Sequence, residues 1–364
     1  MTLLDAPHIT QKLPLHPGPL PGVIEPTFWS GTPWLSPERY TVDCAGYTVD
    51  DTALVPGSEL ARRMRATYDE TGFVLAVNTG LTDLSTMRLM AKLVLADEME
   101  YDGGANPRQR IAPNVYEVGA PLRAWLHYHH EMAYVGRSTA AIGFLGLHAL
   151  PAGRGRTFVS DSIAATDALL ASPFGQKLQR LGIAYHRNLT DRRTFAGRVE
   201  YGVYNHWQQS FDTEDPEVAV ERAHAAGLET EWGPNGLLRT RYEASAFEYF
   251  GCLDRNVLYS SVADHGMWFD TWPLVQHLPY EDRPLDLTFG DGSAFSRDEL
   301  QQFVDVYDAF GTPIDWNVGD VAVICNYRFA HGRPGVHLAD GERRELGVVL
   351  GAQFDRVGAL TDRW

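Results

Sequence analysis

The sequence contains few cysteines, fewer basic than acidic residues and no long apolar run. The three cysteines, Cys44, Cys252 and Cys325, lack CxxC spacing, which argues against a disulfide framework and a cysteine zinc site. The 31 Lys and Arg face 47 Asp and Glu, a formal net charge of −16, so nucleic acid and anionic membranes are not expected partners. No run approaches membrane-spanning length, and no signal-peptide pattern is present. We therefore expect a soluble cytoplasmic protein that acts on a small molecule.

Other common features are also absent. No glycine-rich phosphate loop joins the first helices and strand, which disfavours a dinucleotide-binding fold. There is no internal repeat, low-complexity tract or clear linker. The chain is nevertheless 44% hydrophobic, with 9 Trp, 16 Tyr and 16 Phe in 364 residues. This composition supports a large buried core, either in two domains or in one β-rich domain enlarged by insertions.

The first 35 residues differ from the rest of the chain. They are rich in proline, which is incompatible with a helix or a central strand. The prolines are Pro14, Pro17, Pro19, Pro21, Pro26 and Pro33. We expect an extended N-terminal arm over residues 1–35, followed by a single domain over residues 36–364.

Helices are expected where apolar residues recur at helical spacing between capping signals. Ser58–Thr71 has a capping serine and is followed by Gly72, and Ser296 begins a capping box with Glu299. Asp215 followed by Pro216 is a third helix start. The expected helices are Ser58–Thr71, Leu84–Glu98, an interrupted one over 161–181, one over 215–227 and one over 296–310.

Short apolar runs separated by Gly and Pro indicate strands. The expected strands are Phe73–Val77, Asn114–Val118, Leu126–Tyr134, Ala141–Ala149, Leu237–Tyr242, Val257–Ser261, Leu285–Phe289, Val321–Asn326 and Leu346–Phe354. Gly332–Gly341 is expected to be a long turn. The pattern predicts a mainly β protein of the α+β class, with a double-stranded β-helix (jelly roll) core and helical insertions around 161–181, 215–227 and 296–310.

The segment Trp125–Tyr134, WLHYHHEMAY, contains the strongest candidate for chemistry. On an extended strand His129 and Glu131 point to the same face, because strand side chains alternate. With a third histidine far downstream, the pair would form a 2-His-1-carboxylate triad, which leaves positions open on iron(II). His331 is the third candidate, because it follows the strand Val321–Asn326 and precedes arginines.

Four other histidines were weighed as ligands. His130 is expected to pack on the opposite face of the strand. His127 shares the face of His129, where it would either support the site or be a buried structural histidine. His265 and His337 lack the strand-turn context of His331.

Two further side chains are candidates for binding an anionic co-substrate. Thr157 follows a turn, where its hydroxyl can donate to a carboxylate. Arg344 lies on the expected strand after His331, and its planar guanidinium can bind the distal carboxylate of a dicarboxylic co-substrate through two hydrogen bonds.

The ordered set of motifs resembles the taurine-dioxygenase-like (clavaminate-synthase-like) superfamily of iron(II)/2-oxoglutarate oxygenases, and within it the syringomycin-biosynthesis hydroxylase branch. The likeness covers roughly residues 73–354. The matching positions are Tyr101, Gly103, Gly104, Pro107, Arg108, Val115, Tyr116, His129, Glu131, Met132, Tyr134, Trp207, Gln208, Phe211, Leu238, Arg239, Thr240, Trp316, Gly319, Asp320, Asn326, His331, Gly332 and Arg333.

The resemblance implies the cofactors iron(II), 2-oxoglutarate and O2. It implies His129, Glu131 and His331 as iron ligands, and Thr157 with Arg344 as the 2-oxoglutarate site. Arg343 remains an alternative to Arg344, because Gly332–Gly341 is longer than in near relatives and only one of the pair can face inward. The turn before Thr157 also differs from the family's G-G-E-T, and Cys325 replaces the family's aspartate before Asn326.

Related halogenases have Gly or Ala at the position of Glu131, so a carboxylate here implies oxygen transfer. The expected reaction is hydroxylation of an unactivated carbon of a small amino-acid-derived molecule in specialised metabolism, either free or tethered to a carrier protein, with release of succinate and CO2. Desaturation, epoxidation and cyclisation with the same cofactors stay open, as does a catabolic dioxygenase of small organic acids. A metal-binding jelly roll without turnover is the alternative from another class.

Five residues that flank the motifs are candidate substrate contacts, although aromatics near strands are more often core residues. They are Tyr101, Tyr116, Met132, Tyr134 and Phe329. If a carrier protein presents the substrate, Arg154 and Arg156 are the basic pair near the site that could contact it.

Overall fold

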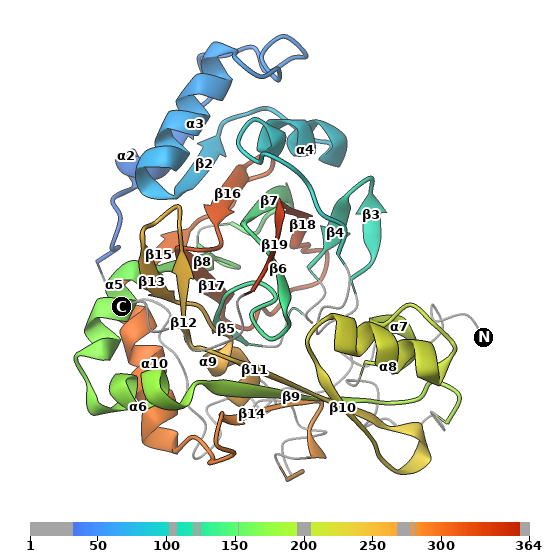
Figure 1. Cartoon of the computed structure of the whole chain (residues 1–364). Helices are drawn as coiled ribbons and strands as arrows, with labels where there is room; N and C mark the ends of the chain where they lie inside the picture. The colour runs from blue at the N-terminus through green and yellow to red at the C-terminus, as the bar shows by residue number, and fades with distance from the viewer. Residues whose placement is uncertain are drawn as a thin grey trace.

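The computed structural model describes residues 32–101, 108–118, 122, 125–151, 153–194, 205–267, 278–279 and 282–356. Within these ranges the chain is a mixed α and β structure with many strands (Figure 1). Residues 1–31 of the expected N-terminal arm lie outside the described residues. At its end, the Trp34 amide donates to Gly311 O at 2.9 Å and the Leu35 amide donates to Thr312 Oγ1 at 3.1 Å. No helix in the described ranges is both long and apolar enough to cross a membrane.

The largest sheet has seven strands in the order β1-β2-β16-β7-β18-β4-β3. β1 pairs with β2 in parallel and the other pairs are antiparallel. The strands are β1 (Thr41–Asp43), β2 (Phe73–Val77), β3 (Arg110–Ala112), β4 (Val115–Glu117), β7 (Ala141–His148), β16 (Val321–Cys325) and β18 (Glu345–Leu350).

A four-stranded sheet in the order β15-β8-β17-β5 carries most of the candidate site. Its strands are β5 (Leu126–His129), β8 (Thr157–Asp161), β15 (Gly311–Ile314) and β17 (Phe329–Arg333). All three pairings are antiparallel. β17 lies between β5 and β8, so it is hydrogen-bonded along both edges.

Alternation along the central strands explains how the two sheets pack. On β7, Ile142 and Phe144 belong to the large core cluster that also contains Tyr128 and Phe158 of the four-stranded sheet. Leu145 points the other way, into a second cluster with Met90 and other residues of the flanking helices. The seven-stranded sheet is therefore buried on both faces, with the four-stranded sheet on one and helices on the other.

Helices α3 (Glu59–Thr71) and α4 (Leu84–Lys92) cover that outer face (Figure 1). α3 begins and ends as its capping residues predict: Ser58 Oγ accepts from the Ala61 amide, and Gly72 has a left-handed φ of 77°. α4 ends at Lys92, six residues before the expected Glu98, because residues 93–98 form a turn and bends that bury Leu93, Val94 and Leu95 in the same cluster.

The remaining helices are α2 (Pro37–Tyr40), α5 (Ser162–Leu170), α6 (Pro173–Leu181), α7 (Trp207–Ser210), α8 (Pro216–Ala225), α9 (Val262–Met267), α10 (Arg297–Ala309) and the 3-10 helix η3 (Pro234–Gly236). Of these, α2 lies beside α3 and β2, with Tyr40 stacked on Phe73. The predicted capping box is present at α10, where Ser296 Oγ accepts from the Glu299 amide and the Glu299 carboxylate accepts from the Ser296 amide.

A third sheet, in the order β10-β11-β9-β14, lies beneath the site-bearing sheet in the view of Figure 1. Two strand pairs complete the set. The strands are β9 (Ile183–Leu189), β10 (Glu229–Trp232), β11 (Leu238–Ala244), β14 (Leu285–Phe289), the pair β12 (Phe247–Phe250) and β13 (Arg255–Leu258), and the pair β6 (Arg137–Thr139) and β19 (Gln353–Asp355).

Three predicted boundaries near the site are wrong. The strand expected over Leu126–Tyr134 ends at His129. The expected turn over Gly332–Gly341 begins later, because β17 continues to Arg333. The single strand expected over Leu346–Phe354 is two strands, β18 and β19, which pair with different partners.

Candidate active site

Strand pairing places two candidate metal ligands side by side. His331 on β17 is directly opposite His129 on β5, and their ring centroids are 4.3 Å apart. Phe144 of β7 contacts the His331 ring edge-on at 5.5 Å. The fold therefore joins two histidines that lie 202 positions apart in the sequence (331 minus 129).

Glu131 reaches the same point from a turn. The chain leaves β5 after His129, and Met132 has a φ of 55°, a left-handed conformation that a non-glycine residue adopts at a cost. Asn326 holds this turn from the far side, because its Oδ1 accepts from the Glu131 amide at 2.9 Å. The inward direction of Glu131 thus depends on the turn rather than on strand alternation.

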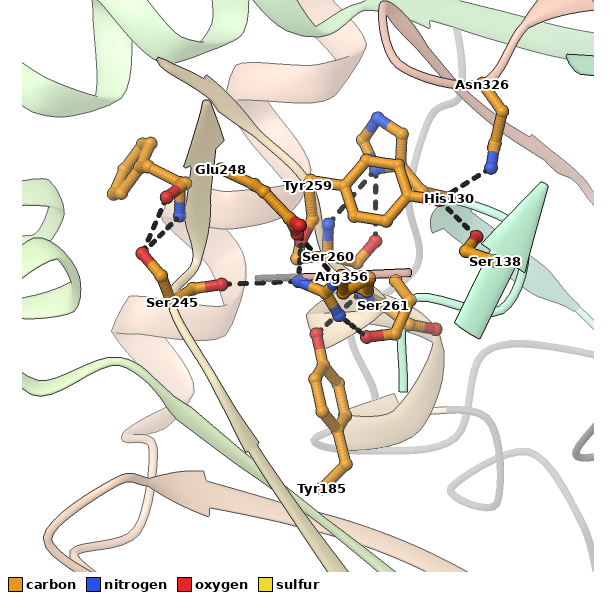
Figure 2. Close-up of polar contacts among 12 residues, drawn as sticks. His130, Ser138, Tyr185, Ser245, Glu248, Tyr259, Ser260, Ser261, Asn326 and Arg356 are labelled. Atoms are coloured by element: carbon orange, nitrogen blue, oxygen red, sulfur yellow. Dashed lines mark hydrogen bonds and ion pairs between the residues drawn. The ribbon is translucent and has the colours of Figure 1, made fainter. Parts of the chain in front are cut away.

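A buried polar network supports the carbonyl side of the same turn (Figure 2). Glu131 O accepts from Ser138 Oγ at 2.7 Å, from Tyr259 OH at 3.2 Å and from Asn326 Nδ2 at 3.2 Å. Figure 2 shows Ser138 and Asn326 both in contact with Tyr259. Arg356 pairs with Glu248 at 2.6 Å, as Figure 2 shows, and donates to Ala133 O two residues after Glu131. Because these groups are buried, their mutual hydrogen bonds fix the backbone that carries Glu131.

The donor atoms of His129, Glu131 and His331 all lie within 4.8 Å of one another. His129 Nδ1 is 2.8 Å from His127 O, and since a carbonyl only accepts, Nδ1 carries the proton and Nε2 is left as a ligand. His331 Nε2 is 3.8 Å from Glu131 Oε2, and burial lowers the pKa of His331 well below its ordinary value. Two imidazoles and one carboxylate on one side of a cavity fit an iron(II) centre with open positions.

Arg108 contacts the carboxylate ligand directly. Its Nη2 lies 2.8 and 2.9 Å from the two oxygens of Glu131, and its guanidinium carbon lies 4.6 Å from the centroid of the Tyr101 ring. The Tyr101 amide in turn donates to Tyr116 OH at 3.1 Å.

Thr157 and Arg344 meet at another part of the same cavity. Arg344 donates from Nε to Gly155 O at 2.7 Å and from Nη2 to Thr157 Oγ1 at 3.3 Å. Trp316 Nε1 also donates to Thr157 Oγ1, at 3.0 Å. Burial lowers the pKa of Arg344 to about 10, which keeps it charged at neutral pH. Arg343 is exposed, so Arg344 is the member of the pair that faces inward.

One cavity connects these groups. Its described lining is Tyr101, Arg108, Val118, Leu126, His129, Glu131, Tyr134, Phe144, Thr157, Asp264, His331, Gly332, Arg333, Arg344, Leu346 and Val348. Burial raises the pKa of Asp264 to about 6 and lowers that of Arg333 to about 9. Arg333 donates from Nη1 to Leu122 O at 2.8 Å.

The other predicted substrate contacts are distributed differently. Tyr101 and Tyr134 line the cavity. Tyr116 OH accepts a hydrogen bond from the Tyr101 amide. Met132 is buried in the turn after Glu131, and Phe329 packs against Phe73 with ring centroids 6.2 Å apart. In the described lining these three do not appear.

The competing histidines lie outside the ligand set. His130 is buried, with Nε2 3.0 Å from Ser162 Oγ and Nδ1 3.1 Å from the Ser260 amide. His127 is buried, and burial lowers its pKa to about 3. His265 contacts Ser261 and Tyr134, and His337 is exposed.

Sequence reasoning gave no role to Arg108, Asp264 or Arg333. The two arginines were present in the quoted motifs, so their positions were visible although their contacts were not. Asp264 lies in the short α9, all of whose residues are buried. A buried aspartate within a short helix has no sequence pattern that would have identified it.

Comparisons with known proteins identify the family of this chain. The sequence profile of the taurine catabolism dioxygenase TauD, TfdA family matches residues 38–350. A clavaminate synthase-like protein of Arabidopsis thaliana is 25% identical over 244 residues, which cover 65% of this chain and 69% of that protein.

Solved structures are similar at lower identity. A taurine dioxygenase from Burkholderia xenovorans aligns at 13% identity with a TM-score of 0.46, covering 88% of each chain. AAD-2, solved with Mn(II) and N-oxalylglycine, aligns at 13% identity with a TM-score of 0.47, covering 87% of this chain and 95% of its own.

The matched range spans most of the chain, and His129, Glu131, His331 and Arg344 lie within it. The chain belongs to the TauD/TfdA family and is a 2-oxoglutarate-dependent dioxygenase that uses iron(II), 2-oxoglutarate and O2.

Proposed function

We propose that this dioxygenase hydroxylates an unactivated carbon of a small amino-acid-derived molecule, with release of succinate and CO2, and that it belongs to the syringomycin-type branch of the family. The observation that carries the proposal is that the His129, Glu131 and His331 donors share one cavity with the Thr157 and Arg344 pair. Desaturation, epoxidation and cyclisation remain alternatives with the same cofactors.

His129, Glu131 and His331 are the proposed iron ligands. The His127 carbonyl fixes the tautomer of His129, and the turn around Met132 aims Glu131 at the two imidazoles. When bound there, iron with 2-oxoglutarate supplies the oxidising chemistry, in which O2 converts the keto acid to succinate and CO2 and one oxygen atom goes to the substrate. A carboxylate at position 131 occupies the place that a halide would need, which supports oxygen transfer.

Thr157 and Arg344 are proposed to hold the distal carboxylate of 2-oxoglutarate. Arg344 has no carboxylate within ion-pair distance among the described residues, so its charge is left for a ligand. Thr157 Oγ1 already accepts from Trp316 and Arg344. Its own hydroxyl proton is therefore available to donate to an anion.

We also propose that the seven-stranded and four-stranded sheets form a double-stranded β-helix core and that residues 36–364 are one domain. The packing of both sheets on one apolar cluster supports this. The cytoplasmic location stays a prediction, and so does the absence of nucleic-acid and membrane partners.

Presentation of the substrate by a carrier protein also stays a prediction. Arg154 pairs with Glu342, and Arg156 pairs with Asp315 at 2.5 Å. The basic pair near the site is thus neutralised by its neighbours, which favours a free substrate.

The test is anaerobic addition of iron(II) and 2-oxoglutarate, followed through the weak visible charge-transfer band of a chelated keto acid. Wild type should develop the band and His129→Ala should not. In Arg344→Ala the half-saturating 2-oxoglutarate concentration should rise roughly 30-fold or more, because a buried charge pair loses one partner.

Arg343→Ala is the matched control, since Arg343 is the exposed neighbour on the same segment. It should bind 2-oxoglutarate as wild type does. A folded, metal-loaded wild type without the band would contradict the proposal and favour a binding protein without turnover. Equal effects of the two arginine variants would remove Arg344 from the assigned role.

A further inference from the structure

The way in which Glu131 is held bears on how many positions of a bound metal stay open. The three candidate ligands are His129, Glu131 and His331, and an octahedral metal held by one atom of each keeps three further positions. A chelated keto acid takes two of them and O2 needs the last. A carboxylate, however, binds a metal through one oxygen or through both. If Glu131 used both, it would fill the position that O2 needs.

Arg108 lies against both oxygens of Glu131. Its Nη2 is 2.8 Å from Oε1 and 2.9 Å from Oε2. An atom at nearly equal distances from two oxygens lies on the plane midway between them. A metal bound through both oxygens would lie on that same plane and would meet a positively charged guanidinium there. Arg108 therefore opposes binding through two oxygens.

Binding through one oxygen remains possible, and Oε2 is the atom placed for it. Glu131 Oε2 is 3.8 Å from His331 Nε2, and the donor atoms of the three candidate ligands lie within 4.8 Å of one another. A carboxylate has lone pairs on each oxygen to accept more than one partner. Oε2 can thus accept from Arg108 and still bind a metal on its other side.

The surroundings keep Arg108 on Glu131. Its side chain is 12% exposed, and the Tyr101 ring lies 4.6 Å from its guanidinium carbon. Its Nε and Nη1 have no hydrogen-bond partner among the described residues, so Glu131 is the anion that this part of the structure offers to it. Moving away would leave a largely buried charge without a partner, which is costly. We therefore expect the pair to persist when a metal binds.

We propose that Arg108 is a positioning residue that limits Glu131 to one oxygen, Oε2, on the metal and so keeps a coordination position open for O2. The inference rests on the proposed function, because it takes Glu131 as a metal ligand. Removal of the guanidinium should leave metal loading intact, since the second oxygen becomes available as a ligand. Binding of a small molecule at the position that this oxygen fills should weaken. A residue that only supported the fold would weaken both.

Nitric oxide tests the open position, because it binds iron(II) in the place of O2 without turnover. Wild type and variants are loaded anaerobically with iron(II) and 2-oxoglutarate, and the charge-transfer band verifies loading. Nitric oxide is then titrated, and the iron nitrosyl is followed by electron paramagnetic resonance. Arg108→Met should keep the band, and its half-saturating nitric oxide concentration should rise roughly tenfold or more. Arg108→Lys keeps a cation beside Glu131 and should stay within about threefold of wild type.

Arg88→Met is the matched control. Arg88 of α4 pairs through Nε with Glu98 Oε1 at 2.7 Å, and the two side chains are 21% and 7% exposed. Neither residue is in the described lining of the cavity. This variant removes an arginine from a largely buried carboxylate, as Arg108→Met does, and it should bind nitric oxide as wild type does.

Wild type allows a second measurement that depends on no variant. With Mn(II) and N-oxalylglycine bound, a Glu131 that uses one oxygen leaves a water on the metal, and this water shortens the relaxation time of solvent protons. Its presence is the expected result. Its absence would mean that both oxygens bind, and this would overturn the inference even if Arg108→Met fails to fold or load.

A loaded Arg108→Met protein that binds nitric oxide as wild type does would also overturn the inference, and so would an equal loss in Arg88→Met. These outcomes leave the proposed function intact, because iron(II) and 2-oxoglutarate have bound. A folded wild type that develops no charge-transfer band would instead contradict the proposed function, and with it this inference.

Discussion

Glu131 and Arg108 depend on each other at the residue scale. Glu131 is the only described carboxylate within hydrogen-bond distance of the Arg108 guanidinium. Both are largely buried, with side chains 5% and 12% exposed. The carboxylate therefore has two roles, as a candidate metal ligand and as the counter-ion of a buried arginine.

Replacing Glu131 by alanine should leave that arginine without its counter-ion. In the metal-free protein we expect the free energy of unfolding to fall by about 3–5 kcal/mol. A small anion could enter the space left by the carboxylate, so chloride should restore part of the loss. Urea unfolding in 100 mM sodium chloride and in 100 mM sodium gluconate measures this.

Wild type in the same two salts is the control, and its stability should differ little between them. If Glu131→Ala responds to chloride no more than wild type does, Arg108 finds another acceptor when Glu131 is absent. In that case an alanine at position 131 does not open a chloride site in this chain.

At the element scale, the turn after β5 determines where Glu131 points. Asn326 is fully buried and contacts both the amide and the carbonyl of Glu131, and its Nδ2 also donates to Thr139 O at 2.8 Å and Tyr259 OH at 2.7 Å. The Asn326 side chain thus connects Thr139 of β6, Tyr259 and the turn at Glu131. Figure 2 shows its contact with Tyr259.

Asn326→Ala should therefore weaken metal binding as well as stability. We expect about 2–4 kcal/mol of lost stability from the unsatisfied buried groups, and roughly 10–100-fold weaker Mn(II) binding because the ligand loses its orientation. Mn(II) binding is measured by electron paramagnetic resonance of the free ion.

Asn188→Ala is the matched control, since Asn188 is a buried asparagine of β9 that bonds to Arg283 O at 2.7 Å, away from the ligands. It should cost stability and leave Mn(II) affinity unchanged. Equal losses of affinity in both variants would mean that general destabilisation, rather than the orientation of Glu131, explains the effect.

This turn also marks the limit of what the sequence could predict. The helix caps at Ser58 and Ser296 were predictable because they depend on residues within one turn of helix. The segment after His129 contains no Gly, Pro, Asn or Asp before Gly136, so local preferences continue the strand. The turn exists because a side chain 195 positions away accepts from Glu131.

The strand that carries His331 was missed for a similar reason. Phe329–Arg333 contains Gly332 and precedes Pro334, which locally favours a turn. It is a strand because β5 and β8 pair with it on both sides. The candidate ligands could still be named, because motif order along the chain does not require knowledge of how each segment is folded.

At the scale of the whole molecule, the cavity joins parts of the chain from Tyr101 to Val348. β5, the turn after it, β8, β17 and β18 each supply a side chain to it. The chain carries a formal net charge of −16, while three arginines line this one space and two of them, Arg333 and Arg344, are buried. Ligands that enter it should therefore stabilise the fold as a whole.

Loading with metal and keto-acid analogue should consequently raise the Tm of the full chain. At about 100 times its dissociation constant, a ligand adds about 2.7 kcal/mol of stability, which corresponds to a Tm increase of roughly 3–6 °C for a chain of this size. N-oxalylglycine alone should have little effect, since its chelation needs the metal. EDTA should reverse the increase.

His331→Ala should lose the response to Mn(II), while His337→Ala, at an exposed histidine, should keep it. An equal increase in both histidine variants would show that the metal binds elsewhere, and the three side chains brought together by β5, its turn and β17 would then not be the metal site.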